Sequence, residues 1–166
     1  MLHLKVGQNK MSSQDPFIRP IQLEDADEMA RLHAQSAAYL RALGDDTNFQ
    51  FNAHIYRRDG FDDNPAFSGF CAVLDNHLIG YLLYHWAYDT DRALRYLFVI
   101  DLLVDEEQRQ SGIGKALMNH AAAFCQEAGG AELFWAVYDK NEAALNFYNR
   151  LGAEEINDLH FMRLKI

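Results

Sequence analysis

Arg109, Gly112 and Gly114 follow an R-x-x-G-x-G spacing in a turn that joins an apolar run to a helical pattern. The first N–H groups of a helix lack intrahelical partners and carry the positive end of the helix dipole, so a bound anion satisfies both. Glycine permits a positive φ and a close approach of the backbone to a phosphate. The spacing therefore predicts a phosphate-binding turn, with an ordinary strand-to-helix turn as the alternative.

The residues around this turn exclude two better-known glycine motifs. A P-loop needs glycine at position 108 and Ser or Thr after a Gly-Lys pair, where the chain has Gln108 and Ala116. A dinucleotide-binding fingerprint needs a third small residue where Leu117 stands.

A strand and a helix must hold the turn in place. Residues 97–103 are apolar and β-branched, which predicts a buried strand. Apolar residues recur at helical spacing after the turn, and Gly129-Gly130 provides the helix end. The positions at this spacing are Ile113, Ala116, Leu117, His120, Ala121, Phe124 and Ala128.

Asp101 lies inside the predicted strand and is a candidate catalytic residue. A buried carboxylate is unfavourable without a partner, so it must meet a cation, hydrogen-bond donors or water at a cavity. A cationic acceptor amine is one such partner. Asp101 would either bind this amine or accept its proton through water. A structural ion pair is the alternative.

A second block, residues 139–153, carries an N-x-x-A-x-x-F-Y pattern in Asn141, Ala144, Phe147 and Tyr148. With this block the chain resembles the GNAT (GCN5-related N-acetyltransferase) superfamily over residues 17–166. The resemblance implies that the R-x-x-G-x-G turn holds the pyrophosphate of acetyl-coenzyme A and that the second block forms a helix beside this co-substrate. It also implies a homodimer.

The resemblance assigns roles to individual residues. Tyr148 stands at the position of the family's general acid. A phenol with a pKa near 10 suits this role, since it is protonated at neutral pH and can protonate a departing thiolate. The backbone of Leu102, Leu103 and Val104 would pair with the pantetheine arm as an added strand. Asn141 would bond the same arm, with helix capping as its alternative role, and Ala144 and Phe147 would pack beside it. The pyrophosphate would meet the side chains or N–H groups of Arg109, Gln110, Ser111, Gly112, Ile113, Gly114 and Lys115.

Within the superfamily the chain looks most like the diamine (spermidine/spermine and thialysine) acetyltransferases. The matching stretches are residues 58–61, Tyr88-Asp89, Asp101 and residues 147–153. Ile100 stands where that branch commonly has glutamate. We expect an acetyl-coenzyme A-dependent N-acetyltransferase that acts by direct transfer on a primary amine of a small, cationic acceptor. The alternatives are an acetyltransferase of a protein N-terminus or lysine, and a non-catalytic coenzyme A-binding module. His33 and His85 are weaker candidates for a base.

Composition narrows the class of partner. The formal net charge is −9, from 15 basic and 24 acidic residues, which argues against a nucleic-acid surface and for a cationic small substrate or for solubility alone. Acids cluster in the region expected to border the acceptor pocket, at Asp45, Asp46, Asp59, Asp62 and Asp63. No apolar run approaches the roughly 20 residues of a membrane helix, so no membrane partner and a cytoplasmic protein are expected. Cys71 and Cys125 are expected to be buried thiols, and the seven histidines lack metal-ligand spacing.

The expected fold class is α/β, a three-layer GNAT fold with a central mixed, mostly antiparallel sheet flanked by helices. Residues 1–14 are expected to be a flexible N-terminal extension and residues 15–166 one N-acetyltransferase domain. The first elements expected are a strand at 17–20, a helix from 24–25 to Gly44, a second helix at 48–58 and a hairpin around Asp75-Asn76-His77. After the motif strand and helix, strands are expected at 133–138, 153–156 and 160–166, with the helix of the second block between the first two.

Overall fold

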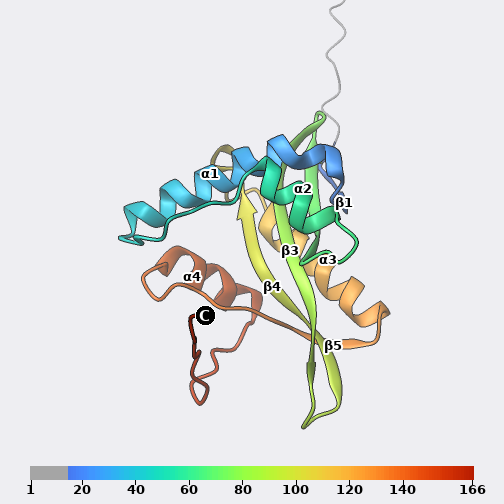
Figure 1. Cartoon of the computed structure of the whole chain (residues 1–166), viewed down its shortest axis with the longest axis vertical. Coiled ribbons are helices and arrows are strands. Elements are labelled where there is room, and N and C mark those ends of the chain that lie inside the picture. The colour runs from blue at the N-terminus through green and yellow to red at the C-terminus, as the bar shows by residue number, and fades with distance from the viewer. Residues whose placement is uncertain (1–14) are drawn as a thin grey trace, which may run out of the picture. The chain divides into compact units, whose positions relative to one another are not determined.

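The computed structural model describes residues 15–166 of the chain. The predicted N-terminal extension, residues 1–14, lies outside the described residues. The described residues form two compact units, one ending at Trp135 and the other spanning residues 136–166. The first unit contains the sheet and its three long helices (Figure 1). It therefore holds the predicted strand, turn and helix that should bind phosphate.

The sheet has five strands in the order β1-β2-β3-β4-β5. The strands β1 to β4 pair antiparallel, and β5 pairs parallel with β4. Their bounds are Phe17–Pro20, Ser68–Leu74, His77–Asp89, Leu94–Val104 and Gly130–Phe134. The expected mixed, mostly antiparallel sheet is therefore confirmed.

Local turn chemistry explains the β2–β3 hairpin. Asp75 and Asn76 have φ values of 49° and 66°, so both central residues occupy the left-handed region that a type I′ turn needs. Asn and Asp tolerate this region better than other residues with a side chain. The hairpin expected around Asp75-Asn76-His77 is confirmed.

Helices cover both faces of the sheet. Figure 1 shows α1 (Ala26–Ala42) and α2 (Ala53–Phe61) on one face and α3 (Ile113–Glu127) on the other. The second expected helix begins at Ala53 rather than residue 48, because the Asn52 side chain accepts hydrogen bonds from the backbone N–H groups of His54 and Ile55 at 3.0 and 3.1 Å. Such a cap fixes the first turn of a helix.

The layer between α1, α2 and the sheet forms the main hydrophobic core. Met29 and Leu32 of α1, Tyr56 of α2 and Tyr81 of β3 are fully buried there. A bidentate contact also secures this layer, because Arg19 of β1 donates to both carboxylate oxygens of Asp25, just before α1, at 2.7 and 2.8 Å. The helix α1 is therefore fixed at its N-terminus as well as along its apolar stripe.

The second unit carries one helix, α4 (Glu142–Leu151), and no strand among its described residues. The strand expected at 133–138 is instead β5, which ends at Phe134. The strands expected at 153–156 and 160–166 are wrong. Alternating apolar residues supply a strand with a face to bury, but a strand also needs a neighbouring backbone to pair with. Met162, Leu164 and Ile166 of this segment are exposed.

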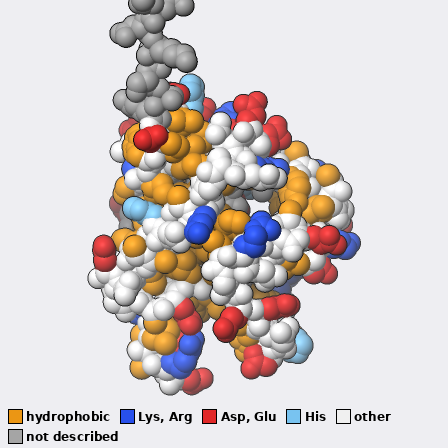
Figure 2. Space-filling view, turned by 180° about the vertical axis from the view of Figure 1, so that it is seen from behind, with side chains coloured by type: hydrophobic (Ala, Val, Ile, Leu, Met, Phe, Trp, Pro, Cys, Tyr) orange, Lys and Arg blue, Asp and Glu red, His pale blue; other side chains and the backbone are white. Residues whose placement is uncertain are grey.

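On the face shown in Figure 2, acidic and basic side chains are interspersed. Among the described residues, no helix is long and apolar enough to cross a membrane.

Candidate active site

The predicted strand, turn and helix are present. Strand β4 ends at Val104, Asp105 caps a short 3-10 helix, η2 (Glu106–Gln108), and α3 begins at Ile113 after the turn. The turn backbone is left-handed at Gln110 (φ 64°) and Gly112 (φ 89°). The chain therefore reverses between strand and helix through the residues of the R-x-x-G-x-G pattern.

Gly112 precedes α3 directly. An added Cβ there would meet no atom within 4 Å, so the positive φ accounts for glycine at this position. The first hydrogen bond of α3 runs from the Ala116 N–H to the Gly112 carbonyl. The N–H groups of Ile113, Gly114 and Lys115 therefore precede the helical hydrogen-bond ladder, as an anion site requires.

Cationic side chains border the same turn. The Arg109 guanidinium lies 5.3 Å from the centre of the Tyr39 ring of α1, and its Nε donates to the Val104 carbonyl at 3.4 Å. Lys115 follows in the first turn of α3. Two cations, free helical N–H groups and the positive end of a helix dipole form a donor set that fits a pyrophosphate.

One edge of β4 is open beyond its pairing with β5. The β4–β5 ladder runs from Arg95 to Phe98, whose partner is Phe134, the last residue of β5. Within residues 15–135, no strand pairs with this edge of β4 between Val99 and Val104. The backbone of Leu102, Leu103 and Val104 is thus able to accept an extended amide chain as an added strand.

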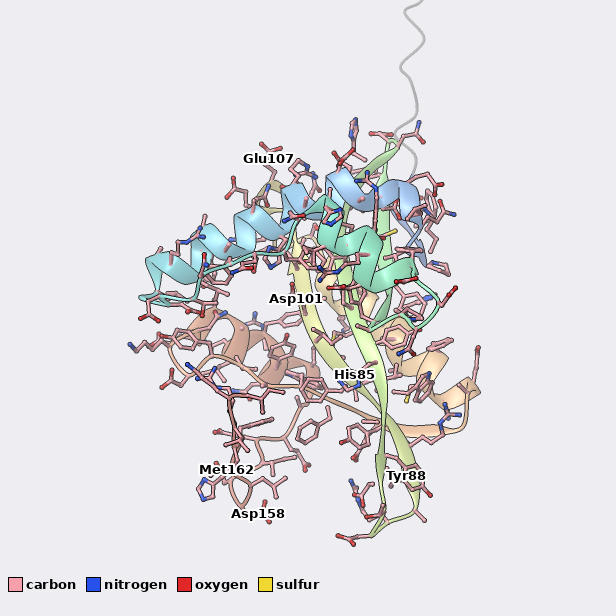
Figure 3. All side chains as sticks on the ribbon, in the orientation of Figure 1. His85, Tyr88, Asp101, Glu107, Asp158 and Met162 are labelled. Atoms are coloured by element: carbon pink, nitrogen blue, oxygen red, sulfur yellow. The ribbon has the colours of Figure 1, made fainter. Side chains whose placement is uncertain are left out.

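A cavity of about 400 Å³ lies between the sheet and the layer formed by α1 and α2. Its walls come from α1, the segment after it, α2 and strands β3 and β4. The lining residues are His33, Ser36, Leu40, Phe49, Phe51, Asp59, Ala66, Phe67, Leu83, Ile100 and Asp101. Figure 3 shows Asp101 on β4, beneath the helical layer. The cavity and the predicted phosphate turn therefore share the same strand.

A β-bulge directs Asp101 to this face. Leu83 pairs with Asp101 and Tyr84 with Val99, which leaves Ile100 without a partner in the β3–β4 ladder. A bulge of this kind changes the direction in which the following side chain points. Asp101 thereby lines the cavity from the middle of an apolar strand.

The Asp101 carboxylate has a donor and a cavity rather than a structural ion pair. The Tyr81 hydroxyl donates a hydrogen bond to its Oδ2 at 2.6 Å. Burial raises the pKa of Asp101, and the Tyr81 hydrogen bond and the neighbouring His33 partly oppose this rise. Among the described residues, no Lys or Arg forms an ion pair with Asp101. The carboxylate therefore retains the capacity to bind a cation in the cavity.

His33 is a cavity residue that sequence reasoning ranked low. Its ring packs against Phe51 at 4.9 Å and Phe49 at 6.2 Å between ring centres, and burial lowers its pKa despite the nearby Asp101 carboxylate. The sequence feature that could have identified His33 is its spacing with Ser36 and Leu40, which places the three residues on one face of α1. Nothing local indicated that this face meets Asp101, because the two segments lie 68 positions apart in the chain (101 minus 33).

The predicted acidic border of the pocket is only partly correct. Asp59 lines the cavity, but its carboxylate is held by the Arg58 side chain at 2.6 and 2.9 Å. The other acids of that cluster, Asp45, Asp46, Asp62 and Asp63, do not line it. Asp46, Asp62 and Asp63 are exposed, and the Asp45 side chain accepts from the Thr47 N–H at 2.9 Å.

The second unit contains the remaining predicted residues, all on or beside α4. The Asn141 side chain accepts a hydrogen bond from the Ala144 N–H at 3.1 Å, so its alternative role as helix cap is confirmed. Phe147 and Tyr148 are neighbours in the helix, with ring centres 5.0 Å apart in an edge-on arrangement. Gly152 ends α4 with a φ of 84°.

Known proteins are similar to this chain in sequence or in architecture. Thialysine N-epsilon-acetyltransferase of Bos taurus is 28% identical over 150 residues, covering 86% of each chain. L-ornithine N5-acetyltransferase of Arabidopsis thaliana is 29% identical over 85 residues, covering 51% of this chain and 37% of its own. Among solved structures, an integron cassette protein from the mobile metagenome of V. cholerae superimposes with a TM-score of 0.78 at 20% identity, covering 92% of this chain and 93% of its own.

The family comparison covers the site in the first unit and α4 in the second. The model of the acetyltransferase (GNAT) family matches residues 30–153. This span contains the cavity residues on α1 and β4, the R-x-x-G-x-G turn and the N-x-x-A-x-x-F-Y helix. The family uses acetyl-coenzyme A as its co-substrate. The chain is therefore an N-acetyltransferase that belongs to the acetyltransferase (GNAT) family.

Proposed function

We propose that this enzyme transfers the acetyl group of acetyl-coenzyme A directly to a primary amine of a small, cationic acceptor. The observation that carries the proposal is Asp101, a carboxylate without a cationic partner in the described structure, lining a cavity of about 400 Å³. A carboxylate in apolar surroundings is stabilised by a bound cation. A second ammonium group on the acceptor, beside the amine that reacts, is such a cation.

The shape and composition of the cavity support a small acceptor. Aromatic side chains form much of its wall, and aromatic faces attract ammonium groups as well as methylene chains. Phe49, Phe51 and Phe67 contribute these faces. A cavity of this volume suits a ligand of small-molecule size, which favours such an acceptor over an extended peptide. The curated relatives named for thialysine and ornithine act on amine acceptors of that kind.

The cavity holds one available carboxylate rather than two. Asp59 is already paired with Arg58, whereas Asp101 accepts from neutral donors, the Tyr81 hydroxyl and the Leu102 backbone. An acceptor with a reacting amine and one further ammonium therefore matches the site. A third charge on the acceptor would have to compete with Arg58 for the Asp59 carboxylate.

The residues of the turn and of β4 would hold the co-substrate. The N–H groups at the start of α3, with Arg109 and Lys115, would bind the pyrophosphate, and the open edge of β4 would orient the pantetheine amides. Acetyl-coenzyme A supplies the acetyl group as a thioester. The neutral acceptor nitrogen attacks the thioester carbon and the carbon–sulfur bond breaks. The Tyr148 phenol gives its proton to the departing thiolate, whose acid has a pKa of about 8.5. The nitrogen releases one proton to water as the amide forms, and the Tyr148 phenolate regains a proton from water.

A thiol-release assay with acetyl-coenzyme A and a panel of acceptors tests the proposal. The panel contains monoamines, diamines, polyamines, basic amino acids, aminoglycosides and short peptides with free N-termini. We expect the highest kcat/KM for compounds with two amino groups. Preferential turnover of peptides would instead establish a protein acetyltransferase, and coenzyme A binding without turnover of any acceptor would establish a binding module.

A further inference from the structure

Helix α1 contacts the segment that leads into the predicted phosphate-binding turn, residues 105–109. The contacts come from a stripe of residues spaced four apart, Arg31, Gln35 and Tyr39. Each member of the stripe meets a different residue between the end of β4 and the glycines. Arg31 contacts Asp105, Gln35 contacts Glu106, and Tyr39 contacts Arg109. The spacing of four places these three side chains on one face of the helix.

Arg31 makes the strongest of these contacts. Its Nη1 lies 2.7 Å from Asp105 Oδ2, and its Nη2 donates to the Leu78 carbonyl at 2.8 Å. Asp105 is 9% exposed, and its Oδ1 accepts from the Glu107 N–H at 3.2 Å, which caps η2. Arg31 therefore holds the Asp105 carboxylate in place, and this carboxylate in turn holds the backbone of η2 at the start of the turn.

The charge around the turn makes this contact necessary. Three acidic residues, Asp105, Glu106 and Glu107, stand directly before a turn that must bind a doubly charged pyrophosphate. Like charges in this position would oppose the ligand. Arg31 neutralises one of them, and the Gln35 Oε1 accepts from the Glu106 N–H at 3.2 Å, which holds the backbone without adding negative charge.

We propose that Arg31 is a positioning residue for coenzyme A, acting through Asp105 on the turn that binds the pyrophosphate. This inference rests on the proposed binding of acetyl-coenzyme A at that turn. A second face of α1 carries His33, Ser36 and Leu40, which line the acceptor cavity. One rigid helix thus supports both the turn and the cavity.

The test compares Arg31→Met with Arg19→Met by titration calorimetry with coenzyme A. Arg19 is a matched control, since it makes the same kind of contact with a nearly buried aspartate, Asp25, at 2.7 Å, but touches neither the turn nor the cavity. We expect Arg31→Met to raise the Kd for coenzyme A about tenfold, equivalent to about 1.4 kcal/mol. Arg19→Met should lower the melting temperature and leave this Kd within twofold of wild type.

Steady-state kinetics separate positioning from general destabilisation. For Arg31→Met we expect KM for acetyl-coenzyme A to rise with little change in kcat at saturation, as for a lost binding contact. Arg31→Lys keeps the charge but cannot reach Asp105 and the Leu78 carbonyl with a planar fork, so it should recover only part of the affinity. Gln35→Ala removes a half-buried side chain on the same stripe and should raise the Kd about threefold. It provides the test if Arg31→Met fails to fold.

The outcomes distinguish this inference from the proposed function. If wild-type protein does not bind coenzyme A, the proposed function fails and this inference with it. If wild type binds coenzyme A but Arg31→Met and Arg19→Met change the Kd equally, only the positioning role is rejected. If Arg31→Met does not fold, an unchanged Kd for Gln35→Ala rejects that role instead.

Discussion

The Tyr81 hydroxyl on β3 donates a 2.6 Å hydrogen bond to Asp101 Oδ2 on β4, at the floor of the cavity. Tyr81 pairs with Leu103 and Leu83 with Asp101, so the two residues are diagonal neighbours on the same face of the antiparallel ladder. The side chain of Tyr81 is fully buried, which fixes the hydroxyl in place. Burial raises the pKa of Asp101, and this bond opposes the rise by favouring the ionised carboxylate.

Tyr81→Phe should shift the acid side of the pH profile. Burial raises the pKa of Asp101, and the Tyr81 hydrogen bond opposes that rise, so its loss should raise this pKa further. If the ionised carboxylate binds the acceptor's ammonium, the acid limb of kcat/KM moves to higher pH. The pH dependence of kcat/KM for a diamine checks this shift, and an unchanged limb would mean that Asp101 does not bind the acceptor in its ionised form.

The same variant makes a prediction about folding stability. A carboxyl whose pKa is raised in the folded state contributes most to stability below its unfolded pKa of about 3.9, and this contribution is lost as the pH rises through the folded pKa. Because Tyr81→Phe raises the folded pKa, its loss of stability relative to wild type should be larger at pH 8 than at pH 4. Denaturant unfolding at the two pH values measures the difference.

Both cysteines should be inert to an aromatic disulfide reagent in the native protein. Cys71 and Cys125 are 0% and 2% exposed, and burial raises the pKa of Cys71 to about 12, with the nearby Asp25 and Arg19 acting in opposite directions. We expect no reaction over minutes in buffer and two thiols per chain in denaturant. Rapid reaction of a native thiol would contradict the buried placement.

Local signals predicted the strand, turn and helix around residues 109–115 correctly and the residues of the cavity poorly. The turn depends on residues 109–115, whose glycines, caps and apolar spacing act within a few positions. The cavity instead combines His33, Phe51, Phe67 and Asp101, which lie on different elements and meet only when the helices pack on the sheet. The strands expected at 153–156 and 160–166 failed for a related reason, since alternation describes a face but not the partner strand.

Gly112→Val should abolish coenzyme A binding. Wild-type protein should gain about 2.7 kcal/mol of stability when coenzyme A is present at a hundredfold excess over its Kd. A β-branched side chain at φ 89° is strained and will displace the turn. Gly129→Val is the matched control, because Gly129 has a φ of 77° and similarly open surroundings at the other end of α3. Thermal melts with and without coenzyme A should show no ligand-induced shift for Gly112→Val alone; a normal shift would place the pyrophosphate elsewhere.

Tyr148→Phe should lower kcat by roughly 10²–10⁴, the usual effect of losing a general acid, with little change in the Kd for coenzyme A. The change removes one hydroxyl and keeps the ring that lies beside Phe147 in α4. Phe147→Leu serves as the control for packing within the helix and should retain most of the activity. A kcat for Tyr148→Phe equal to that of wild type would assign the proton to water or to another residue.

Asp101→Asn should discriminate between acceptors by charge. The attacking amine must be neutral, so a monoamine brings no positive charge to Asp101 in its reactive form, whereas a diamine retains one. Removing the negative charge should therefore raise KM for diaminobutane by about tenfold and for butylamine much less, as expected for the loss of a charge-assisted contact of about 1.4 kcal/mol. The amide oxygen of asparagine can still accept from Tyr81, which limits the structural change. Asp59→Asn provides the comparison, because the Asp59 carboxylate also lines the cavity but is already paired with Arg58. Equal loss of activity on both acceptors would make Asp101 a base or a structural residue instead of the anchor for the second charge.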